Sequence, residues 1–121
     1  MNVDLAENWL QLSLSGEIDM AWMEQHQDKI DALCEELPEV IVVDVQAVTF
    51  MDSTGLGLLA RLVHECSPHP PGAVYLVGPS PVVVKSLQAI GLDRYVTLVN
   101  TLEDNQAMRR KLSALETSIE A

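Results

Sequence analysis

Basic residues are scarce in this chain of 121 residues, which carries 7 lysines and arginines against 18 aspartates and glutamates. The formal net charge at pH 7 is −11. A negatively charged surface repels DNA and RNA, because their phosphate backbones are also negative. Proteins that bind these backbones do so through lysine and arginine side chains. We therefore expect that nucleic acid is not a partner of this protein.

Long apolar runs are also missing. The longest apolar stretches, such as residues 40–43 and 73–77, fall far short of the roughly 20 residues that a membrane-spanning helix needs. The N-terminal residues contain no basic cluster before an apolar run, which a secretory signal or a transit peptide would show. We expect a cytoplasmic protein that does not insert directly into a membrane.

Cysteine is also scarce, with only Cys34 and Cys66. Thiols stay reduced in the cytosol, so both are expected to be small buried or half-buried apolar residues. His64, Cys66 and His69 lie close enough to suggest a metal site. No fourth ligand has a recognised spacing, and residues 67–72 look like a turn. We expect neither a metal nor a cofactor.

The composition is that of a folded protein, with 48% apolar and 21% charged residues. The length suits one domain with a single core. We expect this domain to span residues 1–121, with residues 113–121 as a frayed C-terminal tail.

Apolar periodicity predicts strands that alternate with helices. Strands are expected at residues 9–14, 40–45 with a continuation over 48–50, 73–77 and 95–99. Helices are expected at residues 20–37, 54–66, 80–90 and 102–115. The first strand should end at Ser15 and Gly16, and the β-branched strand should be central and covered on both faces. The order predicts an α/β fold, a mostly parallel sheet of about four to five strands with helices packed on it.

The helix at 54–66 is expected to be amphipathic. Its buried stripe should consist of Leu56, Leu59, Ala60 and Val63. Leu58 points roughly opposite, beside Arg61, and an outward leucine one turn from Ser53 is a candidate contact. Single exposed apolar residues are common on protein surfaces, so Leu58 could equally have no role.

Residues 51–57, with the sequence Met-Asp-Ser-Thr-Gly-Leu-Gly, lie between a buried strand and this helix. Asp and Ser at such a point are often no more than helix caps. A Walker phosphate loop is excluded because no lysine follows Gly57. Acid–base catalysis by Asp19, Asp52 and a histidine is weakly supported, since no histidine is expected beside Ser53 and no Gly-x-Ser-x-Gly elbow is present. We expect that the protein is not an enzyme.

Three blocks of the sequence together resemble the STAS domains, a family named for sulfate transporters and anti-sigma factor antagonists. The blocks are residues 15–19 (Ser-Gly-Glu-Ile-Asp), 43–57 with the Asp-Ser-Thr-Gly-Leu-Gly run, and 76–80 together with Gly91-Leu92-Asp93. This form is similar to the free-standing bacterial anti-sigma factor antagonists. In those proteins the serine after the aspartate is phosphorylated by a partner kinase that is also the anti-sigma factor.

The resemblance implies that Ser53, and not Thr54, is the phosphoacceptor. It implies two partners, an anti-sigma factor with serine kinase activity and a serine phosphatase, and a chain that is a monomer or a weak dimer. The expected contact surface consists of Asp19, Asp52, Ser53, Thr54, Gly55, Leu58 and Arg61. A phosphate at Ser53 would add about −1.5 to −2 charges beside Asp52 and near Asp19, and the complex should then dissociate. It would also meet the free amide hydrogens of the helix N-terminus.

One alternative from another class stays open. Members of the family that serve bacterial lipid transport resemble this chain at similar length. In that case the domain is a subunit of an ABC complex that docks on an ATPase, and Ser53 is merely a helix cap.

Overall fold

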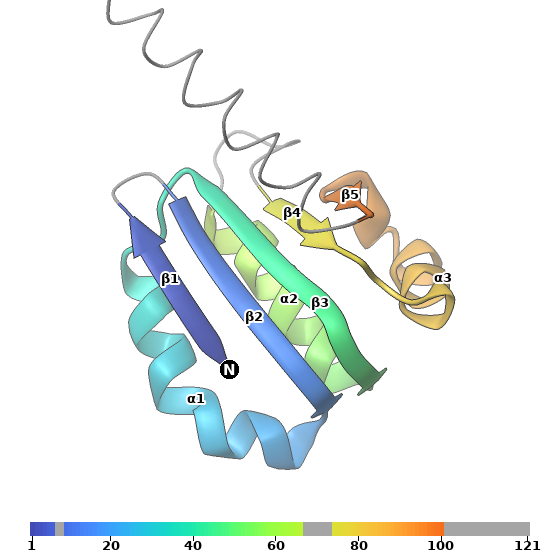
Figure 1. The fold of residues 1–121 in the computed structure, drawn as a ribbon, viewed down its shortest axis with the longest axis horizontal. Helices are drawn as coiled ribbons and strands as arrows, with labels where there is room; N and C mark the ends of the chain where they lie inside the picture. Colours follow the sequence, from blue (N-terminus) through green and yellow to red (C-terminus); the bar gives the residue numbers. More distant parts are fainter. Residues whose placement is uncertain (7–8, 67–73, 101–121) are drawn as a thin grey trace, which may run out of the picture.

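The computed structural model describes residues 1–6, 9–66 and 74–100 (Figure 1). These residues build one sheet with the strand order β1-β2-β3-β4-β5. The strands are β1 (Asn2–Ala6), β2 (Trp9–Ile18), β3 (Val40–Met51), β4 (Val74–Val77) and β5 (Thr97–Val99). The helices are α1 (Met20–Glu35), α2 (Ser53–Cys66) and α3 (Pro81–Ile90), followed by a 3₁₀ turn, η1 (Leu92–Arg94).

The sheet is mostly parallel, as the sequence predicts. Strands β2 to β5 pair in parallel, and only β1 runs antiparallel, against β2. The β-branched strand β3 is central, and its residues Ile41, Val42 and Val43 are fully buried. Both of its faces are therefore covered, as expected of such a run. Strand β1 was not anticipated.

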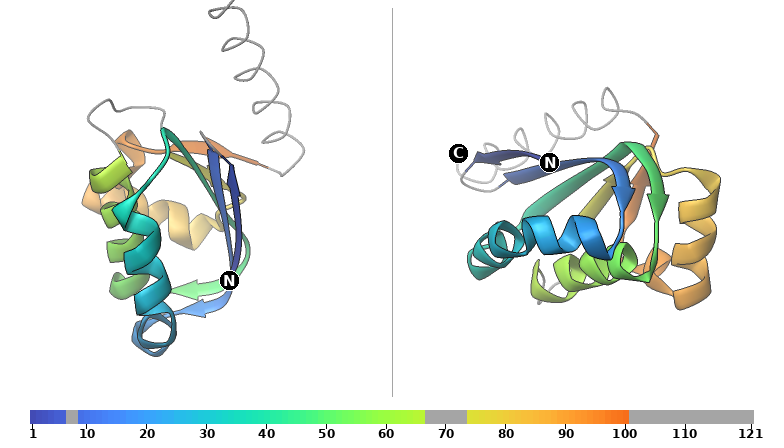
Figure 2. Two further views of the ribbon diagram at one scale, coloured as in Figure 1. Left: turned by 90° about the vertical axis from the view of Figure 1, so that its left-hand side faces the viewer. Right: turned by 90° about the horizontal axis from the view of Figure 1, so that it is seen from below.

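The helices α1, α2 and α3 lie on one face of the sheet (Figure 2). Alternate side chains of each strand point to this face and form the main core with the helices. That core includes Leu10, Leu12, Ile41, Val43, Val74, Leu76, Leu59, Leu62, Ile30 and Leu87. The intervening strand residues form a second buried cluster, which consists of Trp9, Val42, Tyr75, Val77 and Val99.

Strand β2 does not end at Ser15 and Gly16, which corrects the prediction. It continues to Ile18, and its register against β3 shifts between Ser13 and Ser15 and again between Gly16 and Glu17. Gly16 has a φ of 75°, which glycine adopts without strain. At each shift β3 advances by one residue more than β2, so the extra residues belong to β3, and β2 continues past the Ser-Gly pair toward the site described below.

The ends of the helices agree with the sequence signals at most positions. Ser80 caps α3 with Pro81 as its first residue, and Gly91 ends it with a φ of 77°. Helix α1 ends at Glu35, two residues earlier than predicted. The helix predicted at 102–115 and the tail at 113–121 lie outside the described residues. Within the described part of the chain, no helix is long and apolar enough to cross a membrane.

Candidate functional site

Strands β2 and β3 end side by side, and this brings the starts of α1 and α2 together. Ile18 pairs with Met51 in the parallel ladder, and the N–H of Asp52 donates to the carbonyl of Ile18 at 3.2 Å. The first residues after the two strands, Asp19 and Asp52, therefore lie at one edge of the sheet. The sequence predicted both residues for a common surface, and the structure brings them together.

Both aspartates cap the helices that follow them. The N–H of Trp22 donates to Asp19 Oδ1 at 2.9 Å. The N–H groups of Thr54 and Gly55 donate to Asp52 Oδ1 at 2.8 and 3.2 Å. A carboxylate suits this position, because it accepts hydrogens that the first turn cannot bond internally and faces the positive end of the helix dipole.

Ser53 is not the cap of α2, because Asp52 already has that role. The carbonyl of Asp52 also accepts the first helical hydrogen bond, from Leu56 N–H at 3.0 Å. Ser53 is the first residue inside the helix and is exposed. The expectation that a phosphate at Ser53 would meet free amides is wrong for Thr54 and Gly55, whose N–H groups are bonded to Asp52.

Gly55 serves packing, which corrects its assignment to the contact surface. It is buried, and a Cβ built on it would lie 3.0 Å from the carbonyl oxygen of Ile18 and would also overlap Met51 Cγ. The missing side chain lets the first turn of α2 approach the end of β2 closely. Gly55 thus sets the position of Ser53 without itself being exposed.

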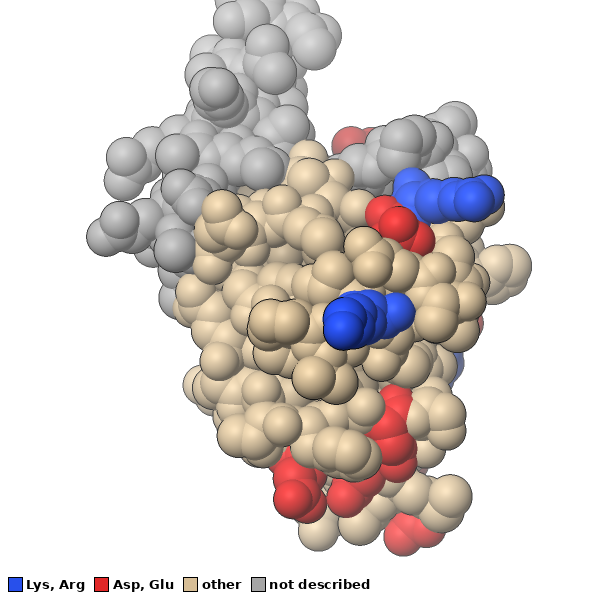
Figure 3. Space-filling view, turned by 90° about the vertical axis from the view of Figure 1, so that its right-hand side faces the viewer, with Lys and Arg blue, Asp and Glu red and all other residues tan. Residues whose placement is uncertain are grey.

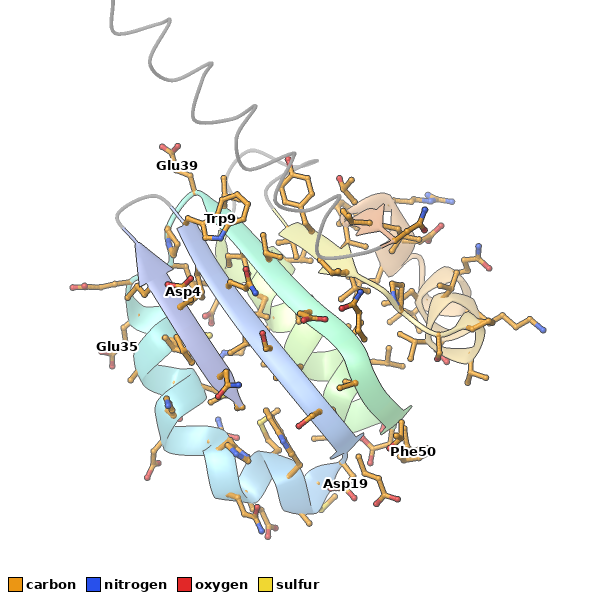
Figure 4. The ribbon with its side chains drawn as sticks, in the orientation of Figure 1. Asp4, Trp9, Asp19, Glu35, Glu39 and Phe50 are labelled. Atoms are coloured by element: carbon orange, nitrogen blue, oxygen red, sulfur yellow. The ribbon has the colours of Figure 1, made fainter. Side chains whose placement is uncertain are left out.

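Two exposed apolar side chains at this edge were not predicted as site residues. Met20, the first residue of α1, is 65% exposed, and Phe50, near the end of β3, is 52% exposed. Phe50 stays exposed because β3 pairs with β4 only over residues 41–44 and continues beyond it. Figure 4 shows Phe50 and Asp19 close together where the two long strands end. The apolar run after Asp19 was the one sequence signal for Met20.

The charges around the site are of one sign. No lysine or arginine occurs among residues 1–28 or 30–60, which include β2, β3 and the first turns of α1 and α2. Glu17, Asp19 and Asp52 lie at the edge itself. Ser53 therefore has carboxylates as neighbours and no lysine or arginine in the segments that form this edge.

Leu58 does not point outward, and its assignment to the contact surface was wrong. Its side chain is 2% exposed and belongs to the main core. Helix α2 contacts both β3 and α1, so it is buried over a wider arc than one stripe. Leu58, Leu59 and Leu62 form the buried side, while Leu56, Ala60 and Val63 of the predicted stripe are half-buried against it.

Arg61 joins the two helices two turns away from Ser53. Its Nη1 donates to Asp31 of α1 at 2.7 Å, and its Nε donates to Glu65 at 3.3 Å. The hydrogen bond between Arg61 and Asp31 lowers the pKa of Asp31 and raises that of Arg61. Arg61 lies eight positions after Ser53 in α2, which is roughly 12 Å along the helix axis. The structure does not bring Arg61 to the edge where the other site residues meet.

Cys34 and the residues that suggested a metal site in the sequence, His64, Cys66 and His69, lie away from Ser53 or outside the described residues. Cys34 is a free, half-buried thiol, and burial together with a hydrogen bond to Glu65 raises its pKa to about 11. In the part of the chain that is described, no group of three His, Cys, Asp or Glu residues could hold a metal. His64 lies near the far end of α2, roughly 16 Å along the helix from Ser53. His69 and the side chain of Cys66 lie outside the described residues.

The comparisons with known proteins agree with this architecture. The family model described as STAS domain matches residues 1–105. The chain belongs to the STAS domain family. The resemblance inferred from the sequence blocks is confirmed.

Two proteins that are similar to this STAS domain are named as anti-sigma factor antagonists. The chain is 30% identical to the anti-sigma-F factor antagonist RsfB of Mycobacterium tuberculosis over 93 residues, 77% of this chain and 75% of the relative. A crystal structure of an anti-sigma factor antagonist from Mycobacterium paratuberculosis matches with 28% identity and a TM-score of 0.73, over 90% and 92% of the two chains.

A second similar structure is that of the Bacillus cell fate determinant SpoIIAA in its phosphorylated form. It matches this STAS domain with 25% identity and a TM-score of 0.67, covering 90% of this chain and 96% of SpoIIAA. The same fold therefore occurs in a relative that has been solved as a phosphoprotein.

Proposed function

We propose that this STAS domain is a non-enzymatic, cytoplasmic binding protein, an anti-sigma factor antagonist that is inactivated by phosphorylation of Ser53. In the unphosphorylated form it binds an anti-sigma factor that is also the serine kinase, and a serine phosphatase restores the active form. The observation that carries the proposal is that Ser53 is exposed at the start of α2 and is not needed as the helix cap. Asp52 caps this helix instead. Family membership and the named relatives support it.

The chemistry around Ser53 explains how one phosphate could control binding. The chain has no basic residue among residues 30–60 to neutralise it, and Asp52 holds the amides of Thr54 and Gly55. The phosphate would add about −1.5 to −2 charges and remain hydrated. A partner that packs on Met20 and Phe50 would have to strip that water, which is unfavourable for an uncompensated charge.

A kinase assay tests the site. Wild type, Ser53→Ala and Thr54→Val would be incubated with the purified anti-sigma factor kinase and labelled ATP. We expect label on wild type and Thr54→Val and none on Ser53→Ala. If Ser53→Ala is labelled as well as wild type, the assignment of the phosphoacceptor is wrong.

The apolar part of the surface has a separate test. Phe50→Ser should weaken binding of the anti-sigma factor by about tenfold, because truncation of a large apolar contact costs more than about 1 kcal/mol at an interface centre. Leu5→Ser is the matched control, since Leu5 is also exposed but pairs near the opposite end of β2. Equal affinities for the two variants in a binding titration would remove Phe50 from the interface.

A further inference from the structure

The described helices contain two glycines, and both lie in the first turns of α2. Glycine weakens a helix relative to alanine, because its backbone loses more freedom on folding, so a helical glycine calls for a reason. Gly55 has one in its close approach to Ile18. Gly57 has none in the fold. A Cβ built on it would meet no atom of the described residues within 4 Å, and its backbone lacks the positive φ that favours glycine.

Gly57 is exposed and lies on the same side of α2 as Ser53. Residues four apart in a helix are neighbours on one face, so Gly57 follows Ser53 one turn later, roughly 6 Å along the axis. The buried side of α2, with Leu58, Leu59 and Leu62, faces the other way. Gly57→Ala would therefore strengthen the helix of the free domain, and its methyl group would point outward beside Ser53.

We propose that Gly57 is a contact residue for the anti-sigma factor, at which the main chain of that partner lies directly on α2. The inference rests on the proposed function and deepens it, because it names the residue that sets how closely the partner approaches Ser53. A glycine that the fold does not need is expected where another backbone comes close, since a side chain there would hold it away. Residues that lower stability without a gain in the fold are typical of functional sites.

Phosphorylation of Ser53 makes the same demand on space. In that transfer Ser53 Oγ bonds to the γ-phosphorus of ATP, the bond from this phosphorus to the bridging oxygen breaks, ADP leaves, and the hydroxyl proton passes to a base of the kinase. The attacking oxygen must come within about 3–3.5 Å of the phosphorus, roughly in line with the leaving oxygen. The kinase must therefore close over the first turns of α2, where a side chain at position 57 would obstruct it.

Helix α3 offers a control on a separate surface. Figure 3 shows the side of the molecule that carries α3, which is mostly uncharged, with acidic side chains gathered at its lower edge. Ser86 lies within α3, and its hydroxyl donates back to the carbonyl of Val82 at 3.1 Å. A serine bonded in this way slightly weakens its helix, so Ser86→Ala should stabilise the fold as Gly57→Ala does.

Binding titrations and thermal melts on the full chain test the inference. Wild type, Gly57→Ala, Gly57→Leu and Ser86→Ala would be titrated with the purified anti-sigma factor. Gly57→Ala should raise the melting temperature by about 2–6 °C and yet bind at least about fivefold more weakly. Gly57→Leu should bind more weakly again, because a larger side chain holds the partner farther away. Ser86→Ala should be at least as stable as wild type and bind equally well.

The rate at which the kinase labels Ser53 is a second measurement on the same variants. With the kinase well below saturation, we expect the initial rate to fall from wild type to Gly57→Ala and again to Gly57→Leu. Ser86→Ala should be labelled like wild type. A graded loss with side-chain size is what a steric contact at Gly57 requires.

Several results would overturn the inference. Gly57 variants that bind and are labelled like wild type would do so and leave the proposed function intact. A lower melting temperature of Gly57→Ala would show that the fold itself needs this glycine. An equal loss of affinity in Ser86→Ala would show that helix stability, and not contact at Gly57, controls binding. Failure of wild type to bind the anti-sigma factor would instead overturn the proposed function, and this inference with it.

Discussion

At the scale of single residues, Asp52 and Ser53 have different tasks although they are neighbours. Asp52→Ala should lower the free energy of unfolding by about 0.5–2 kcal/mol, because the amides of Thr54 and Gly55 lose their acceptor. Ser53→Ala should change it by less than about 0.5 kcal/mol, as is usual for an exposed residue. Chemical denaturation of both variants measures this difference. If Ser53→Ala lowers the free energy of unfolding as much as Asp52→Ala does, Ser53 is the helix cap after all.

Leu58 gives a second prediction at this scale. Leu58→Ala should destabilise the fold by about 2–5 kcal/mol, the usual cost of a cavity in place of a buried leucine. Leu56→Ala, on the half-buried side of α2, should cost clearly less. Thermal or chemical unfolding compares the two. If Leu58→Ala is as stable as Leu56→Ala, the side chain of Leu58 is not buried in the core, and the prediction from the sequence that it points outward would stand.

At the scale of secondary-structure elements, the bridge from Arg61 to Asp31 holds α2 against α1. The pKa of Asp31 is lower in the folded state than in the unfolded chain. The bridge therefore stabilises the fold at any pH above the pKa that Asp31 has in the unfolded chain. This stabilisation is lost as the pH falls through the pKa of Asp31 in the folded state. Arg61→Gln should therefore melt below wild type at pH 7, and the gap should close in acid. Lys29→Gln, which removes the same charge from an exposed position of α1, is the control. A gap that persists once Asp31 is protonated would contradict the bridge.

The elements also show what the sequence could and could not predict. The order of the elements from β2 to β5 and the place of Ser53 between a strand and a helix followed from periodicity and spacing. Strand β1 was not predicted, and the role of Ser53 came from the resemblance to the STAS family. The buried side of α2 could not be predicted from periodicity, because two sets of residues fit a helical period equally well. One set is Leu56, Leu59 and Val63, and the other is Leu58, Leu59 and Leu62. Only the packing of α2 against both the sheet and α1 chooses between them. The exposure of Phe50 likewise depends on where β4 stops.

At the scale of the whole molecule, the chain separates two kinds of surface. The acidic edge at the ends of β2 and β3 carries Ser53 with Met20 and Phe50, whereas α3, η1 and β5 expose apolar residues with little charge. The net charge follows from the composition, and the sequence shows that residues 1–66 carry most of it. Only the fold shows that the weakly charged elements α3, η1 and β5 lie together on one side of the molecule.

The affinity of the anti-sigma factor for Ser53→Asp relative to Ser53→Ala tests the central proposal most directly. Neither variant disturbs the cap at Asp52, so a difference in binding cannot come from a difference in folding, and thermal melts would verify this. If negative charge at this position controls the complex, Ser53→Asp should bind at least about tenfold more weakly, a difference of about 1.4 kcal/mol. Equal affinities of the two variants would contradict the proposed switch.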